Sequence, residues 1–293
     1  MTVSDENPVD DVADGEEKRS GRKIRTGRNL PLAITSGVAL GALVLAAIYP
    51  FPAAFVAITS AAVLIGLREL NRAMAGQRMA LALPPLMVGG VAMQACAYFG
   101  GPEWLVGATA VTAILALSWR LRDGAEGYLR DAAANLFTVC YLPFLLGTWL
   151  LLLAAPQDGQ ERLIAFIIVT ISSDIGGYFA GILVGRHKMA PVISPNKTWE
   201  GFSGSVLACM LAGALTVALM LDGPYWAGAV LGVAVVLAAT AGDLIESLTK
   251  RDLGVKDMGH FMPGHGGLMD RIDSLLVAGP VAWVVLSLLV PAG

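Results

Sequence analysis

The sequence predicts an all-α fold, a polytopic membrane helix bundle with about nine transmembrane helices. Hydrophobic residues make up 56% of the 293 residues and charged residues only 15%, with a mean hydropathy of +0.67. Soluble globular proteins do not have this balance. In addition, apolar stretches of about 20 residues, the length of helix that crosses a hydrocarbon core, recur along most of the chain.

The first 28 residues are predicted to form a disordered cytoplasmic tail. They are acidic in their first part and basic in their second part, with almost nothing apolar to bury. The apolar run that follows lacks a persuasive small-residue cleavage site, so we expect it to stay in place as a first membrane span. Residues 29–293 would then form one transmembrane domain.

Nine spans follow from the lengths of the apolar stretches, with boundaries that are good to a few residues. They are expected near residues 30–49, 51–67, 81–99, 102–119, 132–153, 162–184, 202–221, 225–245 and 271–291. The first two are separated mainly by Pro50 and Pro52, so a re-entrant pair is an alternative there.

The basic residues predict the orientation of these spans. Cytoplasmic loops are enriched in Lys and Arg, and with the N-terminus inside, every Lys and Arg except Arg162 lies in the tail or in an inner loop. Arg68-Glu69-Leu70 and the arginines between Arg120 and Arg130 are interpreted as anchors at span ends. This orientation places the loop 246–271 at the cytoplasmic face of the cell membrane.

Residues 243–273 interrupt the apolar pattern with charges, histidines and glycines. The charged and histidine residues are Asp243, Glu246, Lys250, Arg251, Asp252, Lys256, Asp257, His260, His265, Asp270, Arg271 and Asp273. Carboxylates hold hard cations through oxygen. Basic residues neutralise phosphate charge, and glycines let backbone N–H groups approach phosphate oxygens. The mixture predicts a metal-assisted phosphate site.

Helical spacing brings Asp243 and Glu246 onto one face of a span end, and Asp270 and Asp273 onto one face of the next. Two helix ends can therefore present four carboxylates to one place. Carboxylates at membrane depth are costly and normally face a cavity or a partner, which makes them functional candidates. The alternative is that Asp243 and Asp270 only form salt bridges with Lys250 and Arg271. Glu246 and Asp273 could equally be helix-end charges in water.

A second polar group precedes this stretch. Asp174 lies deep in the sixth expected span, and the loop after that span contains Ser194-Pro195-Asn196-Lys197-Thr198-Trp199-Glu200-Gly201. Lys197 can meet phosphate as a point charge, and Thr198 can donate a hydroxyl hydrogen bond. The competing interpretation is a polar helix start, with Ser194 or Thr198 as the cap and Glu200 in the first turn.

Two patterns in these stretches resemble the signature of the phosphatidate cytidylyltransferases, or CDP-diacylglycerol synthases. The first is formed by Ser247, Lys250-Arg251, Lys256-Asp257, His265-Gly266-Gly267 and Asp270-Arg271-Ile272-Asp273. The second, S-P-x-K-T-x-E-G, is matched by residues 194–201. The resemblance spans roughly residues 160–290, and the earlier helices match only as generic membrane spans.

The resemblance implies transfer of a cytidylyl group from CTP to phosphatidic acid, giving CDP-diacylglycerol and pyrophosphate. It implies a requirement for Mg²⁺, with a second, monovalent cation left open, and it suggests a homodimer. The expected partners are therefore CTP, phosphatidic acid and the bilayer, without nucleic acid. The membrane keeps the diacyl tails in lipid while the headgroup meets CTP at the inner surface.

The resemblance also implies roles for individual residues. Asp243 and Asp270 would hold the divalent cation, with Asp174 as a third contributor. The residues expected to act in the reaction are Asp243, Lys250, Arg251, Lys256, Asp257, His265, Asp270, Arg271 and Asp273. Those expected to bind substrate are Asp174, Ser194, Lys197, Thr198, Glu200, Ser247, Gly266 and Gly267.

Two other classes of membrane protein compete with this interpretation. An ion-coupled transporter would bind a cation at Asp174, Asp243 and Asp270, but the polar residues gather at one face instead of leading across the bilayer. A CDP-alcohol phosphotransferase would need the helix motif D-G-x-x-A-R, and Asp123-Gly124-Ala125-Glu126 lacks its second half. A relative that acts on an archaeal lipid precursor also stays open.

Overall fold

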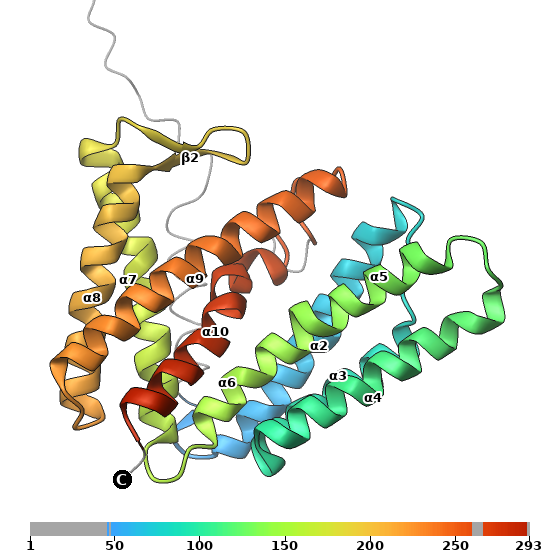
Figure 1. Ribbon diagram of the computed structural model, residues 1–293, viewed down its shortest axis with the longest axis horizontal. Coiled ribbons are helices and arrows are strands. Elements are labelled where there is room, and N and C mark those ends of the chain that lie inside the picture. Colours follow the sequence, from blue (N-terminus) through green and yellow to red (C-terminus); the bar gives the residue numbers. More distant parts are fainter. Residues whose placement is uncertain (1–45, 47, 260–265, 292–293) are drawn as a thin grey trace, which may run out of the picture.

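The computed structural model describes residues 46, 48–259 and 266–291, and these are mainly helical (Figure 1). The first half contains α2 (Pro52–Ala75), α3 (Leu83–Gly100), α4 (Pro102–Trp119), η1 (Arg120–Asp123), α5 (Tyr128–Val139), η2 (Cys140–Phe144) and α6 (Leu145–Leu153). The second half contains α7 (Gly159–Val184), β1 (Lys188–Ala190), β2 (Ser194–Thr198), α8 (Trp199–Met220), α9 (Tyr225–Asp252) and α10 (Met269–Leu289). The all-α prediction is confirmed.

Seven helices of the described part are long and apolar enough to cross a membrane, which makes the chain an integral membrane protein. Two of the seven join shorter elements, in residues 102–123 and 128–153. The predicted count of nine is not confirmed. The predicted tail and nearly all of the first expected span, 30–49, lie outside the described residues, and the 18-residue helix α3 is not among the seven.

The helices form two groups that meet at α10. On one side, α7 packs against α8 and α8 against α9, while on the other α2, α3 and α4 pack in sequence order. Helix α10 contacts α9 and α7 of the first group and α6 of the second, and Figure 1 shows it between them. A shift of α10 would therefore disturb both groups.

Glycines allow close backbone approach along the first group. A Cβ at Gly204 of α8 would overlap Ala180 of α7, and Gly213 of α8 and Gly228 of α9 lie directly against each other. A Cβ at Gly242 of α9 would lie 2.6 Å from the carbonyl oxygen of Asp273 in α10. In lipid, such packing at small residues drives helix association in place of apolar burial.

The segment between α7 and α8 forms a short antiparallel hairpin. Lys188 of β1 lies opposite Thr198 of β2, and Ala190 lies opposite Ser194. The sequence predicted a polar loop here, without strands. The hairpin lies at the same end of the bundle as the C-terminal end of α9 and the N-terminal end of α5 (Figure 1).

Arg162, the one basic residue expected on the outer side, is 3% exposed near the start of α7. Its guanidinium donates to the carbonyl oxygens of Leu286 and Val290 at 3.2 and 2.6 Å, and to the carboxylate of Asp158 at 2.7 and 2.9 Å. The last carbonyls of a helix have no partner within it and favour a cation. Arg162 thus caps the C-terminal end of α10.

We predict that Arg162→Gln lowers the thermal unfolding temperature of the purified protein. Leaving buried acceptors without a partner costs about 1–3 kcal/mol each, and both Asp158 and the end of α10 lose their donor. The matched control is Arg72→Gln, at an exposed position in the last turn of α2. An unfolding temperature for Arg162→Gln equal to that of the control would contradict the capping role.

Candidate active site

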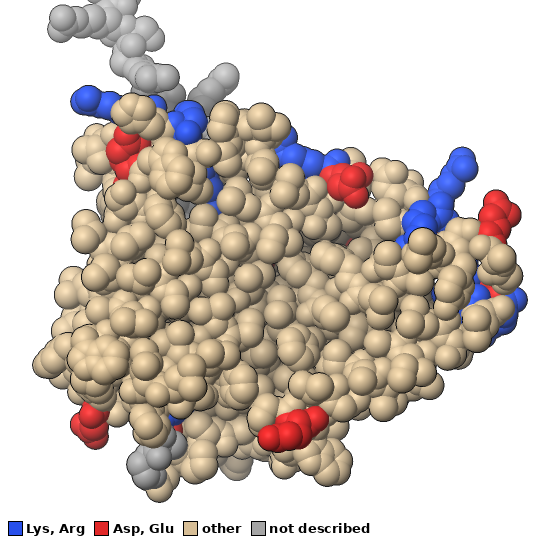
Figure 2. Space-filling model, in the orientation of Figure 1, with Lys and Arg blue, Asp and Glu red and all other residues tan. Residues whose placement is uncertain are grey.

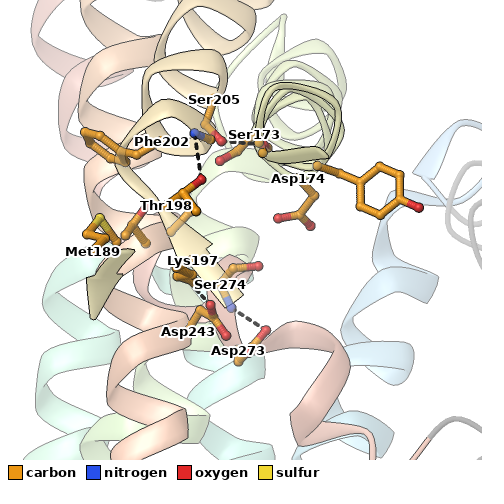
Figure 3. Close-up of a pocket in the computed structure, with 16 residues that line it drawn as sticks. Ser173, Asp174, Met189, Lys197, Thr198, Phe202, Ser205, Asp243, Asp273 and Ser274 are labelled. Carbon is orange, nitrogen blue, oxygen red and sulfur yellow. Dashed lines mark hydrogen bonds and ion pairs between the residues drawn. The ribbon is translucent and has the colours of Figure 1, made fainter. Parts of the chain in front are cut away.

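A polar cavity of about 360 Å³ lies among α7, α8, α9, α10 and the hairpin (Figure 3). Its polar lining consists of Ser173, Asp174, Tyr178, Lys197, Thr198, Ser205, Thr240, Asp243, Asp273 and Ser274. Polar side chains inside a membrane bundle normally face a functional cavity. The cavity is therefore the candidate active site.

Lys197 and Asp243 join the two polar stretches of the sequence. The Lys197 ammonium from β2 forms an ion pair with the Asp243 carboxylate from α9 (Figure 3). The two side chains are 26% and 35% exposed, so a ligand in the cavity can reach both. Figure 2 shows Lys and Arg side chains gathered at the hairpin end of the bundle, whereas the opposite end shows mainly acidic and uncharged residues.

Two further carboxylates face the same space. Asp174 points into the cavity from α7, and Asp273 lies near Asp243 (Figure 3). The close approach at Gly242 brings Asp273 and Asp243 together, because it places the α10 backbone directly against α9. Three carboxylates and one lysine give this part of the cavity an excess of negative charge, which suits a cation that accompanies phosphate groups.

The start of α8 combines the two interpretations given for residues 194–201. Thr198 caps the helix, because its Oγ1 accepts a hydrogen bond from the N–H of Gly201 at 3.1 Å, and it also lines the cavity. Glu200 accepts from the backbone N–H groups of Arg186 and His187 at 3.1 Å, and its Oε1 lies 2.6 Å from the His187 ring. Glu200 therefore holds the base of the hairpin.

A second group of charges lies around Lys250. Its Nζ is 2.5 Å from Oε2 of the fully buried Glu246 and 2.9 Å from Oδ1 of Asp270. Oδ2 of Asp270 also accepts from the N–H groups of Gly267 at 2.8 Å and Met258 at 3.1 Å. The salt bridge considered for Asp270 is thus present, and Asp270 is not among the described residues that line the cavity.

The remaining predicted residues lie around these two groups without lining the cavity. Arg251, Lys256 and Asp257 are exposed at the end of α9 and just beyond it, and Ser194, Ser247 and Arg271 are partly exposed. Gly266 has a φ of +81°, a backbone conformation that favours glycine. His265 lies outside the described residues, so its predicted role stays a prediction.

Glu69 and most of the small polar residues of the cavity are not among the site residues predicted from the sequence. Glu69 was interpreted as part of a membrane anchor, yet it is 3% exposed and accepts hydrogen bonds from the N–H groups of Leu268 and Met269. Its position near the end of an apolar span was the available signal, since a carboxylate there needs a partner. Ser173, which belongs to the polar stretch around Asp174, and Ser274, which follows Asp273, were given no role of their own.

The donor set fits an open site for a hard cation. Among the described residues, no group of three His, Cys, Asp or Glu side chains is arranged to hold a metal ion. Mg²⁺ is usually held by one or two carboxylates together with waters and substrate phosphates. Asp243 and Asp273 can supply such a pair, and Asp174 faces them across the cavity.

Comparison with known proteins places the chain in a family. Residues 32–289 match the cytidylyltransferase family. The phosphatidate cytidylyltransferase of Mycobacterium leprae is 39% identical over 284 residues, which cover 90% of each chain. That of Mycobacterium bovis is 37% identical over 309 residues, covering 99% of this chain and 100% of the relative.

A shorter match is found with a relative outside the mycobacteria. The phosphatidate cytidylyltransferase of Staphylococcus aureus is 37% identical over 174 residues, covering 59% of this chain and 65% of the relative. The mycobacterial matches extend the likeness well beyond residues 160–290, into helices that were recognised only as generic spans. The chain belongs to the cytidylyltransferase family.

Proposed function

We propose that this protein transfers the cytidylyl group of CTP to phosphatidic acid and forms CDP-diacylglycerol and pyrophosphate for phospholipid synthesis. The mycobacterial relatives carry the name of this activity. One observation carries the proposal: Lys197, Asp174, Asp243 and Asp273 line the same cavity, and Lys197 forms an ion pair with Asp243. The family match leaves the transporter interpretation without support.

The chemistry needs positioning and charge neutralisation more than covalent work by the protein. An oxygen of the phosphatidic acid phosphate attacks the α-phosphorus of CTP, and the bond from that phosphorus to pyrophosphate breaks. No protein nucleophile takes part. Lys197 would meet the triphosphate as a point charge, and because the Thr198 oxygen accepts from Gly201, its hydroxyl hydrogen is available to donate to phosphate.

A divalent cation, Mg²⁺ in our proposal, would supply charge neutralisation of the triphosphate. Asp243 is the first candidate to hold it. The metal pair predicted from the sequence is Asp243 with Asp270. The contacts favour Asp273 instead, because Asp273 lies at the same cavity as Asp243 while Asp270 is bound by Lys250. Asp174 would complete the carboxylate lining. Substrate phosphates would supply further oxygen ligands to the cation.

The lipid substrate would reach the cavity from the side of α7. Tyr178 lines the cavity and is 64% exposed, and the next turns of α7 expose Phe179, Ile182 and Leu183. In a membrane this apolar surface faces the acyl chains of lipids. A phosphatidic acid molecule could therefore keep its tails against α7 while its headgroup enters the cavity.

The direct test uses purified full-length protein with phosphatidic acid, labelled CTP and Mg²⁺, and we expect CDP-diacylglycerol to form. Lys197→Gln should lower kcat by roughly 10²–10³, the usual cost of removing one charge-stabilising donor. Lys188→Gln, at an exposed position of the same hairpin, is the matched control and should retain activity. Absence of product with every divalent cation would refute the proposed function.

The metal assignment is tested by Mn²⁺ binding, followed by electron paramagnetic resonance in the presence of CTP. Asp243→Asn and Asp273→Asn should each weaken binding about tenfold or more, because removal of one carboxylate ligand costs at least one strong oxygen contact. Asp222→Asn, at an exposed position outside the cavity, should not. If Asp270→Asn weakened Mn²⁺ binding and Asp273→Asn did not, the metal pair would be Asp243 and Asp270, as predicted from the sequence.

The proposed orientation, with the N-terminus and the cavity on the cytoplasmic side, is tested with single cysteines. In a variant that lacks Cys96, Cys140 and Cys209, a cysteine at exposed Val192 should react with a membrane-impermeant reagent only from the inside. A cysteine at Asp222 should react only from the outside, since α8 and α9 meet there at the other end of the bundle. The reverse pattern would overturn the orientation.

A further inference from the structure

The carboxylate of Glu69 caps α10 from a distant part of the chain. Glu69 lies in α2 and is 3% exposed. Its Oε1 accepts from the N–H of Leu268, and its Oε2 accepts from the N–H of Met269, both at 3.0 Å and across 199 and 200 residues of sequence. A carboxylate that uses both oxygens in this way is held in one orientation.

Helix α10 needs this contact because its own sequence does not supply one. The residue at its N-cap position is Leu268, and no side-chain cap is formed there. The first N–H groups of a helix have no partner within it, and the positive end of the helix dipole attracts an anion. Glu69 satisfies both requirements, and the helix end in turn stabilises the buried charge of Glu69.

Two glycines of the segment between α9 and α10 make room for the carboxylate. A Cβ at Gly259 would overlap the Glu69 carboxylate, and a Cβ at Gly267 would lie 2.7 Å from Glu69 Oε2 and 2.7 Å from the Gly259 nitrogen. Gly259 and Gly267 therefore both lie against the Glu69 side chain. Gly267 belongs to the signature, and Gly259 lies two residues after Asp257.

The residues that touch Glu69 are next to those that hold Asp270. The N–H of Gly267 donates to Asp270 at 2.8 Å, and so does that of Met258, the neighbour of Gly259, at 3.1 Å. Asp270 in turn binds Lys250 at 2.9 Å. A movement of Glu69 would thus shift the backbone donors that fix Asp270 and, through Asp270, the ammonium of Lys250.

We infer that Glu69 is a positioning residue for the group formed by Lys250, Asp270 and Gly267, an inference that rests on the proposed function. Glu69 does not line the cavity, so its effect passes through the backbone at Gly259 and Gly267 to Asp270 and Lys250. Arg162 provides a natural contrast. It caps the other end of the same helix through a buried charge but contacts no residue of the signature in the described structure.

The experiment compares Glu69→Gln with Arg162→Gln in the full-length protein in lipid nanodiscs. Amide hydrogen exchange of residues 254–259 and 266–271 should become at least about tenfold faster in Glu69→Gln and should stay unchanged in Arg162→Gln. The value of kcat should fall about 10- to 100-fold in Glu69→Gln, the range typical of residues that orient a ligand without touching substrate. At equal loss of unfolding temperature, Arg162→Gln should lose less activity.

A second variant keeps the inference testable if Glu69→Gln fails to fold. Gly267→Ala leaves the charge of Glu69 in place but pushes a methyl group against it, so it should produce the same local increase in exchange. Unchanged exchange in these residues, or activity losses that simply follow unfolding temperature in both cap variants, would overturn the inference. Exchange needs no substrate, so a failure of the proposed activity would be seen separately, in the wild-type assay.

Discussion

Helix α10 is held at both ends by buried charges that come from other helices. Glu69 of α2 binds its first N–H groups, and Arg162 of α7 binds its last carbonyl groups. A backbone group that is buried away from water needs a partner in the protein, and both ends of α10 find one in these side chains. The anion at the N-terminus and the cation at the C-terminus both match the helix dipole.

The cavity depends on where α10 is fixed. With α10 in place, the close approach at Gly242 sets Asp273 beside Asp243 of α9, and the hairpin adds Lys197 from the other side. The carboxylates of the cavity repel one another, and Lys197 offsets only part of that repulsion. We therefore propose a cation with bound phosphate as the ligand of this cavity, with the helices around it supplying the positioning that phosphoryl transfer requires.

Much of this could be predicted from the sequence, because membrane spans and charge clusters leave strong signals. Apolar length predicted the helices, and the cost of charge at membrane depth singled out Asp174, Asp243 and Asp270. Of these, Asp174 and Asp243 share one cavity and Asp270 does not line it. Helical spacing predicts which residues share a face of a helix, but not which residues of other helices that face contacts. The partners of Asp270 therefore stayed unknown, and the Asp243–Asp270 metal pair remains a prediction.

The partner of Glu69 and the hairpin could not be predicted from the sequence, for different reasons. Glu69 acts across 199 residues, and a single chain gives no sign of so distant a partner. The strands β1 and β2 have three and five residues, too few for an alternating pattern to stand out. The family likeness of the first half was missed because those helices contain few polar residues, so their motifs look like ordinary apolar spans.

The central claim is that the hairpin and α9 act together at one cavity, through Lys197 and Asp243. A double-mutant cycle on kcat/KM, with Lys197→Gln, Asp243→Asn and the combination, measures this directly. Residues that act as one unit lose little more together than the worse single change. The account predicts that result, and losses that multiply in the double variant would show that the two side chains serve separate sites.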